Sequence, residues 1–110
     1  MKKQGLVTFF LVASLLSMWA GALHAADPAA GKTRAAICTT CHGQLGLGQL
    51  PNAPHLAGQP AIYLVEQLKN FRSGKRQSEM MGFIAKPLSD QDIEDLAAWY
   101  ASIHISVTEK

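Results

Sequence analysis

The sequence is poor in charged groups, and the balance between them limits the partners it can have. Charged residues make up 16% of the 110 residues, with ten basic and eight acidic side chains. Two of the basic residues, Lys2 and Lys3, lie in a segment that we expect to be removed, which leaves eight charges of each sign. A neutral domain gives no electrostatic reason to bind nucleic acid or an anionic membrane surface.

Cysteine is equally scarce, because the chain contains only Cys38 and Cys41. Two cysteines three positions apart cannot provide the disulfide framework that stabilises many small exported domains. A structural zinc site needs further thiol or imidazole ligands, so zinc is weakly supported. A redox dithiol of the thioredoxin kind calls for a strand followed by a helix, and that pattern does not surround Cys38.

Runs that alternate apolar and polar residues are also missing after Asp27, so the sequence predicts an all-α fold. We expect a first helix over residues 27–42, with Asp27 as its cap and Pro28 in its first turn. A second helix is expected to begin at Pro60 and to end before Gly74. A third is expected from Ser89, with Asp92 three residues later as an approximate capping box.

Apolar stripes at helical spacing support the second and third helices. The predicted stripes comprise Ile62, Val65, Leu68 and Phe71 in the second helix and Ile93, Leu96, Ala97, Tyr100 and Ile103 in the third. Residues 43–59 contain four glycines and two prolines, and we expect them to form a loop that wraps a site.

Residues 1–26 have the three-part pattern of a secretory signal peptide. Two lysines precede an uncharged apolar run over residues 6–23, and cleavage after Ala25 or Ala26 fits the small residues that follow. The alternative is an uncleaved membrane anchor, since about 18 apolar residues approach the minimum for a spanning helix. We favour processing, which leaves one small domain, residues 27–110, to carry the function.

The motif with defined chemistry is "CTTCH", from Cys38 to His42, which is the C-x-x-C-H pattern of covalent haem attachment. Two residues between the thiols set the sulfurs at a spacing that suits the two vinyl groups of haem. A histidine directly after the second cysteine can then bind the iron from one face. A domain this small buries only about 60 to 65% of its unfolded surface, so a bound group would also complete a thin core.

Together with two further segments, this motif resembles the small class I cytochromes c of bacteria, in particular single-haem periplasmic proteins similar to one half of the dihaem cytochromes. The segments are "AAGKTRAAICTTCHG", "PHLAGQPAIYLVEQLKNFRSGKR" and "MMGFIAKPLSDQDIEDLAAWYAS". The resemblance covers residues 27–103. It implies three main helices and a glycine-rich loop around one covalently bound haem c. It also implies a periplasmic one-electron carrier that acts between redox partner proteins, such as a membrane oxidase or reductase complex, and is not an enzyme.

Roles for individual residues follow from this resemblance by position. Cys38 and Cys41 would form the thioethers, and His42 would bind the iron on the proximal side. Pro54 matches the proline whose carbonyl accepts a hydrogen bond from the ligating histidine, which fixes the tautomer of that histidine. Gly31 matches the glycine where the first and last helices cross, so the family implies that Leu96 and Trp99 pack against it.

The sixth iron ligand in these relatives is a methionine seven residues before the leucine that precedes the final capping serine. Counting back from Leu88 gives Met81, and the neighbouring Met80 is then expected to pack. A second methionine found in many relatives is replaced by Ile84. His55, beside Pro54, is the main rival ligand, and the resemblance places it on the proximal side.

Two other functions use the same features. One is a haem-binding subunit of a larger oxidase or sulfur-oxidising complex, and the other is a small haem enzyme with an open iron. Membrane contact is expected only if the amino-terminal segment is retained. Apolar residues that we expect around the haem, either packing on it or forming a docking rim, are Leu45, Leu47, Leu50 and Phe83. A basic cluster that could steer an acidic partner, or simply be solvated, comprises Lys69, Arg72, Lys75 and Arg76.

Overall fold

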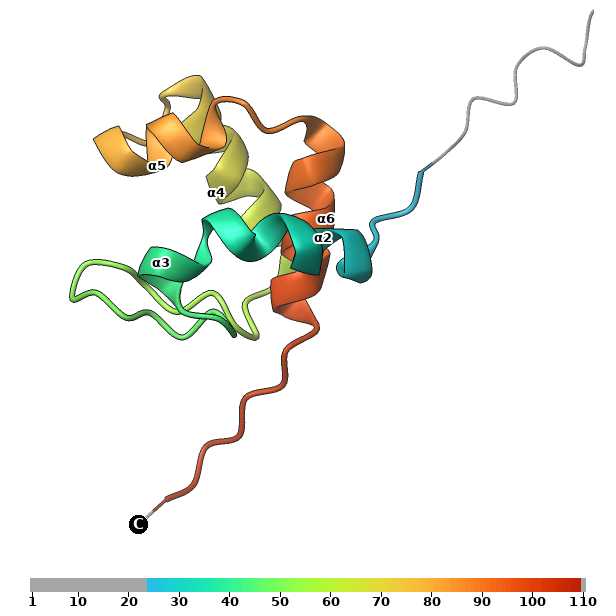
Figure 1. The fold of residues 1–110 in the computed structure, drawn as a ribbon, viewed down its shortest axis with the longest axis vertical. Coiled ribbons are helices and arrows are strands. Elements are labelled where there is room, and N and C mark those ends of the chain that lie inside the picture. The colour runs from blue at the N-terminus through green and yellow to red at the C-terminus, as the bar shows by residue number, and fades with distance from the viewer. Residues whose placement is uncertain (1–23, 110) are drawn as a thin grey trace, which may run out of the picture.

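The computed structural model describes residues 24–109, and within that range it contains helices and no strand, which confirms the predicted all-α class. The elements in chain order are α2 (Pro28–Arg34), the 3₁₀ turn η1 (Ala35–Ile37), α3 (Thr39–His42), α4 (Ala61–Ser73), α5 (Glu79–Ala85) and α6 (Asp90–Ala101) (Figure 1). The predicted signal peptide lies almost entirely outside the described residues.

The first helical segment begins as the sequence predicts but is not one continuous helix. The Asp27 side chain accepts a hydrogen bond of 2.8 Å from the backbone N–H of Ala29, and Pro28 occupies the first helical position. A 3₁₀ turn then separates α2 from α3. Over so short a stretch, apolar periodicity does not distinguish 3.0 from 3.6 residues per turn, so this break could not be predicted.

Helix α5, which holds Met80 and Met81, is not among the three helices that the sequence predicts. Its N-terminus is capped by Ser78, whose hydroxyl accepts a 3.2 Å hydrogen bond from the backbone N–H of Met81. A seven-residue helix is too short to be stable on local propensity alone, and Gly82 lowers that propensity further. Contact with α4 stabilises it instead.

Helices α4 and α6 provide most of the core. All five residues of the predicted α6 stripe are buried or partly buried, and Ile93 has no exposed surface. The capping box at Ser89 and Asp92 is present. The α4 stripe is wrong at Ile62, which is 81% exposed, whereas Leu64 is buried. The buried face of α4 is rotated from the predicted stripe because it meets both α5 and α6.

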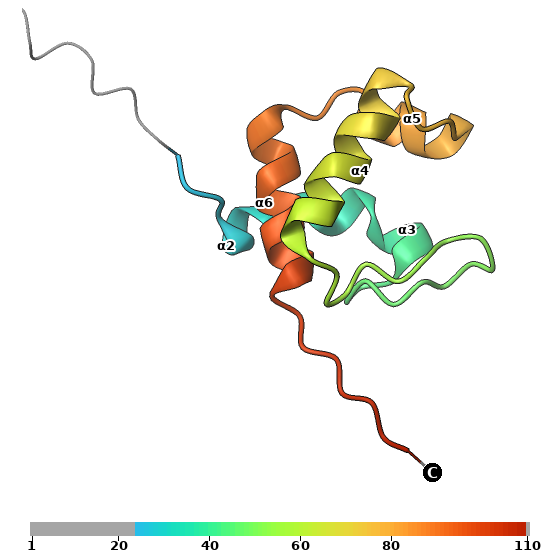
Figure 2. The same ribbon diagram turned by 180° about the vertical axis from the view of Figure 1, so that it is seen from behind.

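Helix α2 crosses α6 at Gly31, and both ribbon views show this crossing (Figures 1 and 2). A Cβ atom added at Gly31 would lie 1.9 Å from the backbone oxygen of Asp95 and 2.9 Å from Cβ of Trp99. Glycine is therefore required by space at this position. The contact with Trp99 agrees with the family expectation, but the closest atoms belong to the backbone of Asp95 rather than to Leu96.

The loop over residues 43–59 has no helix and is closed by its own backbone hydrogen bonds. Leu56 and Ala57 both donate to the carbonyl oxygen of Gly46, at 2.7 and 3.1 Å. Gly46 has a positive φ of 75°, and a Cβ there would lie 2.8 Å from the ring of Tyr100. The loop is thus held against α6 at its base, while its tip extends beside α3 (Figures 1 and 2).

Candidate functional site

The imidazole of His42 is the most constrained polar group of the motif. His42 lies at the end of α3, is 7% exposed, and its Nδ1 is 2.8 Å from the carbonyl oxygen of Pro54. A carbonyl can only accept, so Nδ1 carries the proton and Nε2 keeps its lone pair in the neutral ring. The structure thus contains the contact that the family resemblance implies for Pro54, and it leaves Nε2 able to bind a metal.

Cys38 and Cys41 lie on the same helical turn as His42. The backbone N–H groups of His42 and Cys41 both point to the carbonyl oxygen of Cys38, at 2.9 and 3.3 Å. Both cysteines are partly buried, and they do not form a disulfide with each other. The backbone of a single turn therefore fixes the two thiols and the imidazole relative to one another.

Burial raises the pKa of the Cys38 thiol, and the neighbouring Tyr100 hydroxyl opposes part of that rise. Burial also raises the pKa of Tyr100 itself. The Tyr100 oxygen is fully buried, yet it makes no hydrogen bond of regular geometry to any described residue. An unpaired buried hydroxyl costs about 1 to 3 kcal/mol, so an unmet donor beside Cys38 fits a site that a further group completes.

The two methionines of α5 differ in exposure. Met80 is 62% exposed, whereas Met81 is partly buried and its backbone N–H is held by Ser78. Helices α3 and α5 lie on the same side of α6 in both ribbon views (Figures 1 and 2). His42, at the end of α3, and Met81, in α5, are near each other. The arrangement places a thioether and an imidazole on separate elements that face one region.

Several large apolar side chains of the loop and of α5 are exposed. Their exposed fractions are 56% for Leu45, 45% for Leu47, 47% for Leu50 and 78% for Phe83. Large apolar groups that gather on one side of a small domain normally contact a ligand or a partner. The chemistry of the donor set and the apolar surroundings both fit a flat, largely apolar cofactor that carries a metal.

The structure also describes the surroundings of His55 and His104. His55 is exposed, and its Nδ1 accepts a 2.8 Å hydrogen bond from the backbone N–H of Gly48, so it closes the loop on itself. His104 is exposed and follows α6 rather than ending it.

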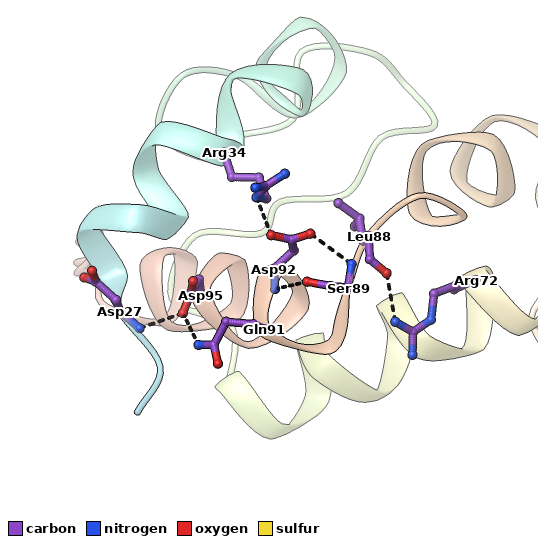
Figure 3. A network of polar contacts seen from close by, with 8 residues as sticks. All are labelled: Asp27, Arg34, Arg72, Leu88, Ser89, Gln91, Asp92 and Asp95. Carbon is purple, nitrogen blue, oxygen red and sulfur yellow. Dashed lines mark hydrogen bonds and ion pairs between the residues drawn. The ribbon is translucent and has the colours of Figure 1, made fainter. Parts of the chain in front are cut away.

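Two arginines of the predicted basic cluster, Arg72 and Arg76, make contacts within the protein. Arg72 donates to the carbonyl of Leu88 at 2.8 Å (Figure 3). It also pairs with Asp90 at 2.6 Å, which ties α4 to the start of α6. Arg76 lies 4.6 Å over the ring of Phe71. These two arginines therefore have structural contacts that a solvated basic face would lack.

Comparison with known proteins identifies the family. The family model described as cytochrome c matches residues 28–103. The chain belongs to the cytochrome c family. It is 47% identical over 100 residues to cytochrome c4 of Pseudomonas aeruginosa, which covers 88% of this chain and 49% of that protein. It is 43% identical over 81 residues to cytochrome c-554(548) of Halomonas halodenitrificans, which covers 71% of this chain and 98% of that protein.

The structural comparison agrees. The crystal structure of reduced recombinant cytochrome c4 from Pseudomonas stutzeri matches with a TM-score of 0.70 and 40% identity, over 76% of this chain and 48% of that one. The chain thus spans about half the length of the cytochrome c4 relatives. With a single C-x-x-C-H motif, this cytochrome c carries one covalently bound haem c.

Proposed function

We propose that this cytochrome c is a one-electron carrier whose haem iron is held between His42 and Met81. The observation that carries the proposal is the buried imidazole of His42, oriented by the carbonyl of Pro54 at 2.8 Å. Bound haem supplies an iron that cycles between the ferric and ferrous states. The chain would supply the attachment through Cys38 and Cys41, the iron ligands His42 and Met81, and apolar side chains around the haem.

The attachment and the proximal ligand come from one turn of backbone. Cys38 and Cys41 each provide one thioether, and His42 binds through Nε2 because Nδ1 donates to Pro54. Such a hydrogen bond orients the ring and raises the basicity of the ligating nitrogen. Cys38 and the short helix α3 that follows it would therefore hold the haem at three points.

Met81 is the proposed ligand on the opposite side. A thioether is neutral and soft and favours ferrous iron, so His/Met ligation raises the reduction potential relative to two imidazoles. It also occupies the sixth position, which leaves no vacant site for oxygen or peroxide. The partial burial of Met81, against 62% exposure of Met80, supports the choice between the two.

We also propose that the protein is exported to the periplasm and that it exchanges electrons with partner proteins in transient complexes. The amino-terminal sequence pattern supports export with removal of residues 1–26. Among residues 24–109, no helix is both long and apolar enough to cross a membrane. The exposed apolar residues of the loop and α5 would border the haem and provide the surface at which electrons pass to and from a partner protein in a short-lived complex.

The experiment compares Met81→Ala with Met80→Ala in haem-loaded protein. We expect Met81→Ala to lower the reduction potential and to let ferrous protein bind carbon monoxide, because the sixth position opens. Met80→Ala is the matched control and should change neither. If Met80→Ala opens the iron and Met81→Ala does not, the ligand assignment is wrong by one residue. If ferrous wild-type protein binds carbon monoxide readily, the carrier proposal is wrong and the protein is a haem protein with an open iron.

A further inference from the structure

Asp95 of α6 is a buried carboxylate whose partners are all neutral among the described residues. It is 8% exposed, and its Oδ1 accepts 2.8 Å hydrogen bonds from the backbone N–H of Asp27 and from Nε2 of Gln91 (Figure 3). A buried charge without a countercharge is costly even when it is hydrogen-bonded. The structure therefore leaves one charge in its core unbalanced.

The two cations of α2, the helix that crosses α6, already have other partners. Arg34 pairs with Asp92 at 2.7 Å, one turn before Asp95, and the ammonium of Lys32 lies 5.3 Å over the ring of Trp99. The countercharge for Asp95 must then come from a group that is not yet charged in the full-length chain. The backbone nitrogen of Asp27 is the candidate, because it already lies at hydrogen-bond distance.

The position of that nitrogen is fixed by the fold. Gly31 donates to the carbonyl oxygen of Asp27 at 2.9 Å, and Gly31 itself is pressed against the backbone of Asp95. The first turn of α2 and the packing of Gly31 together fix the position of Asp27 relative to α6. The Asp27 nitrogen meets Asp95 because of this packing and not through a flexible tail.

We propose that Asp95 is the counter-ion of the mature amino terminus. Hydrolysis of the Ala26–Asp27 bond uses one water, leaves a carboxylate on the released leader and gives Asp27 an amine that is protonated at neutral pH. A hydrogen-bonded ion pair then replaces a hydrogen bond from a neutral donor at the same atoms. Cleavage after Ala25 would instead leave an amide at Asp27 and place the ammonium one residue earlier, about 3.8 Å along the chain.

This inference rests on the proposed export and processing and is independent of the iron ligands. It assigns a role to processing beyond release from the membrane: the cut completes the contact between α2 and α6. The processed protein is therefore more stable than a form whose amino terminus is extended, because an extended chain has only a neutral amide at Asp95.

The test uses four haem-loaded proteins that differ at two places. The amino terminus is either the mature one or is extended by Ser-Gly-Ser-Ala, and position 95 is either Asp or, in Asp95→Asn, an isosteric neutral residue. Intact mass first establishes that the mature chain begins at Ala26 or Asp27. Glu94→Gln, on the same helix, is the matched control for loss of one negative charge.

We expect the extension to lower the thermal unfolding midpoint when Asp95 is present and to have little effect with Asp95→Asn. Glu94→Gln should keep the full effect of the extension. An equal loss in the Asp95 and Asp95→Asn proteins would overturn the inference, as would a mature chain that begins elsewhere. If Asp95→Asn does not fold, the titration of the mature α-amine decides: a pKa above the ordinary range supports the ion pair, and an ordinary value refutes it. A retained leader would refute processing as well, whereas a cleaved leader without this coupling refutes only the ion pair.

Discussion

Replacing Gly31 by alanine tests whether the α2–α6 crossing holds this cytochrome together. The added Cβ would lie 1.9 Å from the backbone oxygen of Asp95, and a backbone atom cannot rotate away as a side chain can. The helices must separate, which costs about 1 to 3 kcal/mol for overpacking. Separation also weakens the 2.8 Å hydrogen bond from Asp27 to Asp95, which is worth about 1 kcal/mol.

Helix propensity acts in the opposite direction, since alanine is favoured over glycine by about 1 kcal/mol. The balance is a loss of roughly 2 kcal/mol, or a fall of roughly 10 °C in the unfolding midpoint of a domain this small. Circular dichroism of haem-loaded protein during heating measures this shift. Ala30→Gly, at an exposed neighbouring position, isolates the propensity effect and should cost only about 1 kcal/mol. A Gly31→Ala protein as stable as wild type would refute the close crossing.

Two further changes, both in α6, test a buried hydroxyl and a helix cap. Tyr100→Phe should destabilise haem-loaded protein by about 1 kcal/mol, because haem attachment is expected to give the buried hydroxyl a partner; a gain in stability in urea unfolding would mean that it stays unpaired. Asp92→Ala removes the capping box and should cost about 1 kcal/mol at pH 7. The hydrogen bond from the Ser89 backbone lowers the pKa of Asp92, so the wild-type advantage is present above the ordinary carboxyl pKa of about 4 and is lost as the pH falls below it. A difference that persists at pH 2 would contradict this sign.

The sequence was sufficient for the features that depend on local chemistry. The haem motif, the caps at Asp27 and Ser89, and the buried stripe of α6 each follow from residue types at fixed spacing, and the structure contains all of them. The link between Gly31 and a helix crossing came from the family resemblance, and the structure gives its physical reason, since a Cβ at position 31 would meet the backbone of Asp95.

The features that the sequence did not predict depend on contacts between distant segments. Helix α5 forms because it packs on α4, and its seven residues give no stable signal alone. Ile62 has an apolar side chain at a helical spacing, yet the direction of the α4–α6 contact leaves it exposed. The pairing of Asp95 with the nitrogen of Asp27 joins residues 68 positions apart, so no local pattern could indicate it.

The central claim is that a methionine sulfur occupies the sixth position of the iron, and the absorption spectrum of the ferric protein tests it most directly. Coordination by Met81 predicts a weak long-wavelength charge-transfer band from sulfur to iron in the wild-type protein. The band should persist in Met80→Ala and disappear in Met81→Ala. A wild-type ferric spectrum without that band would contradict His/Met ligation and, with it, the proposed carrier.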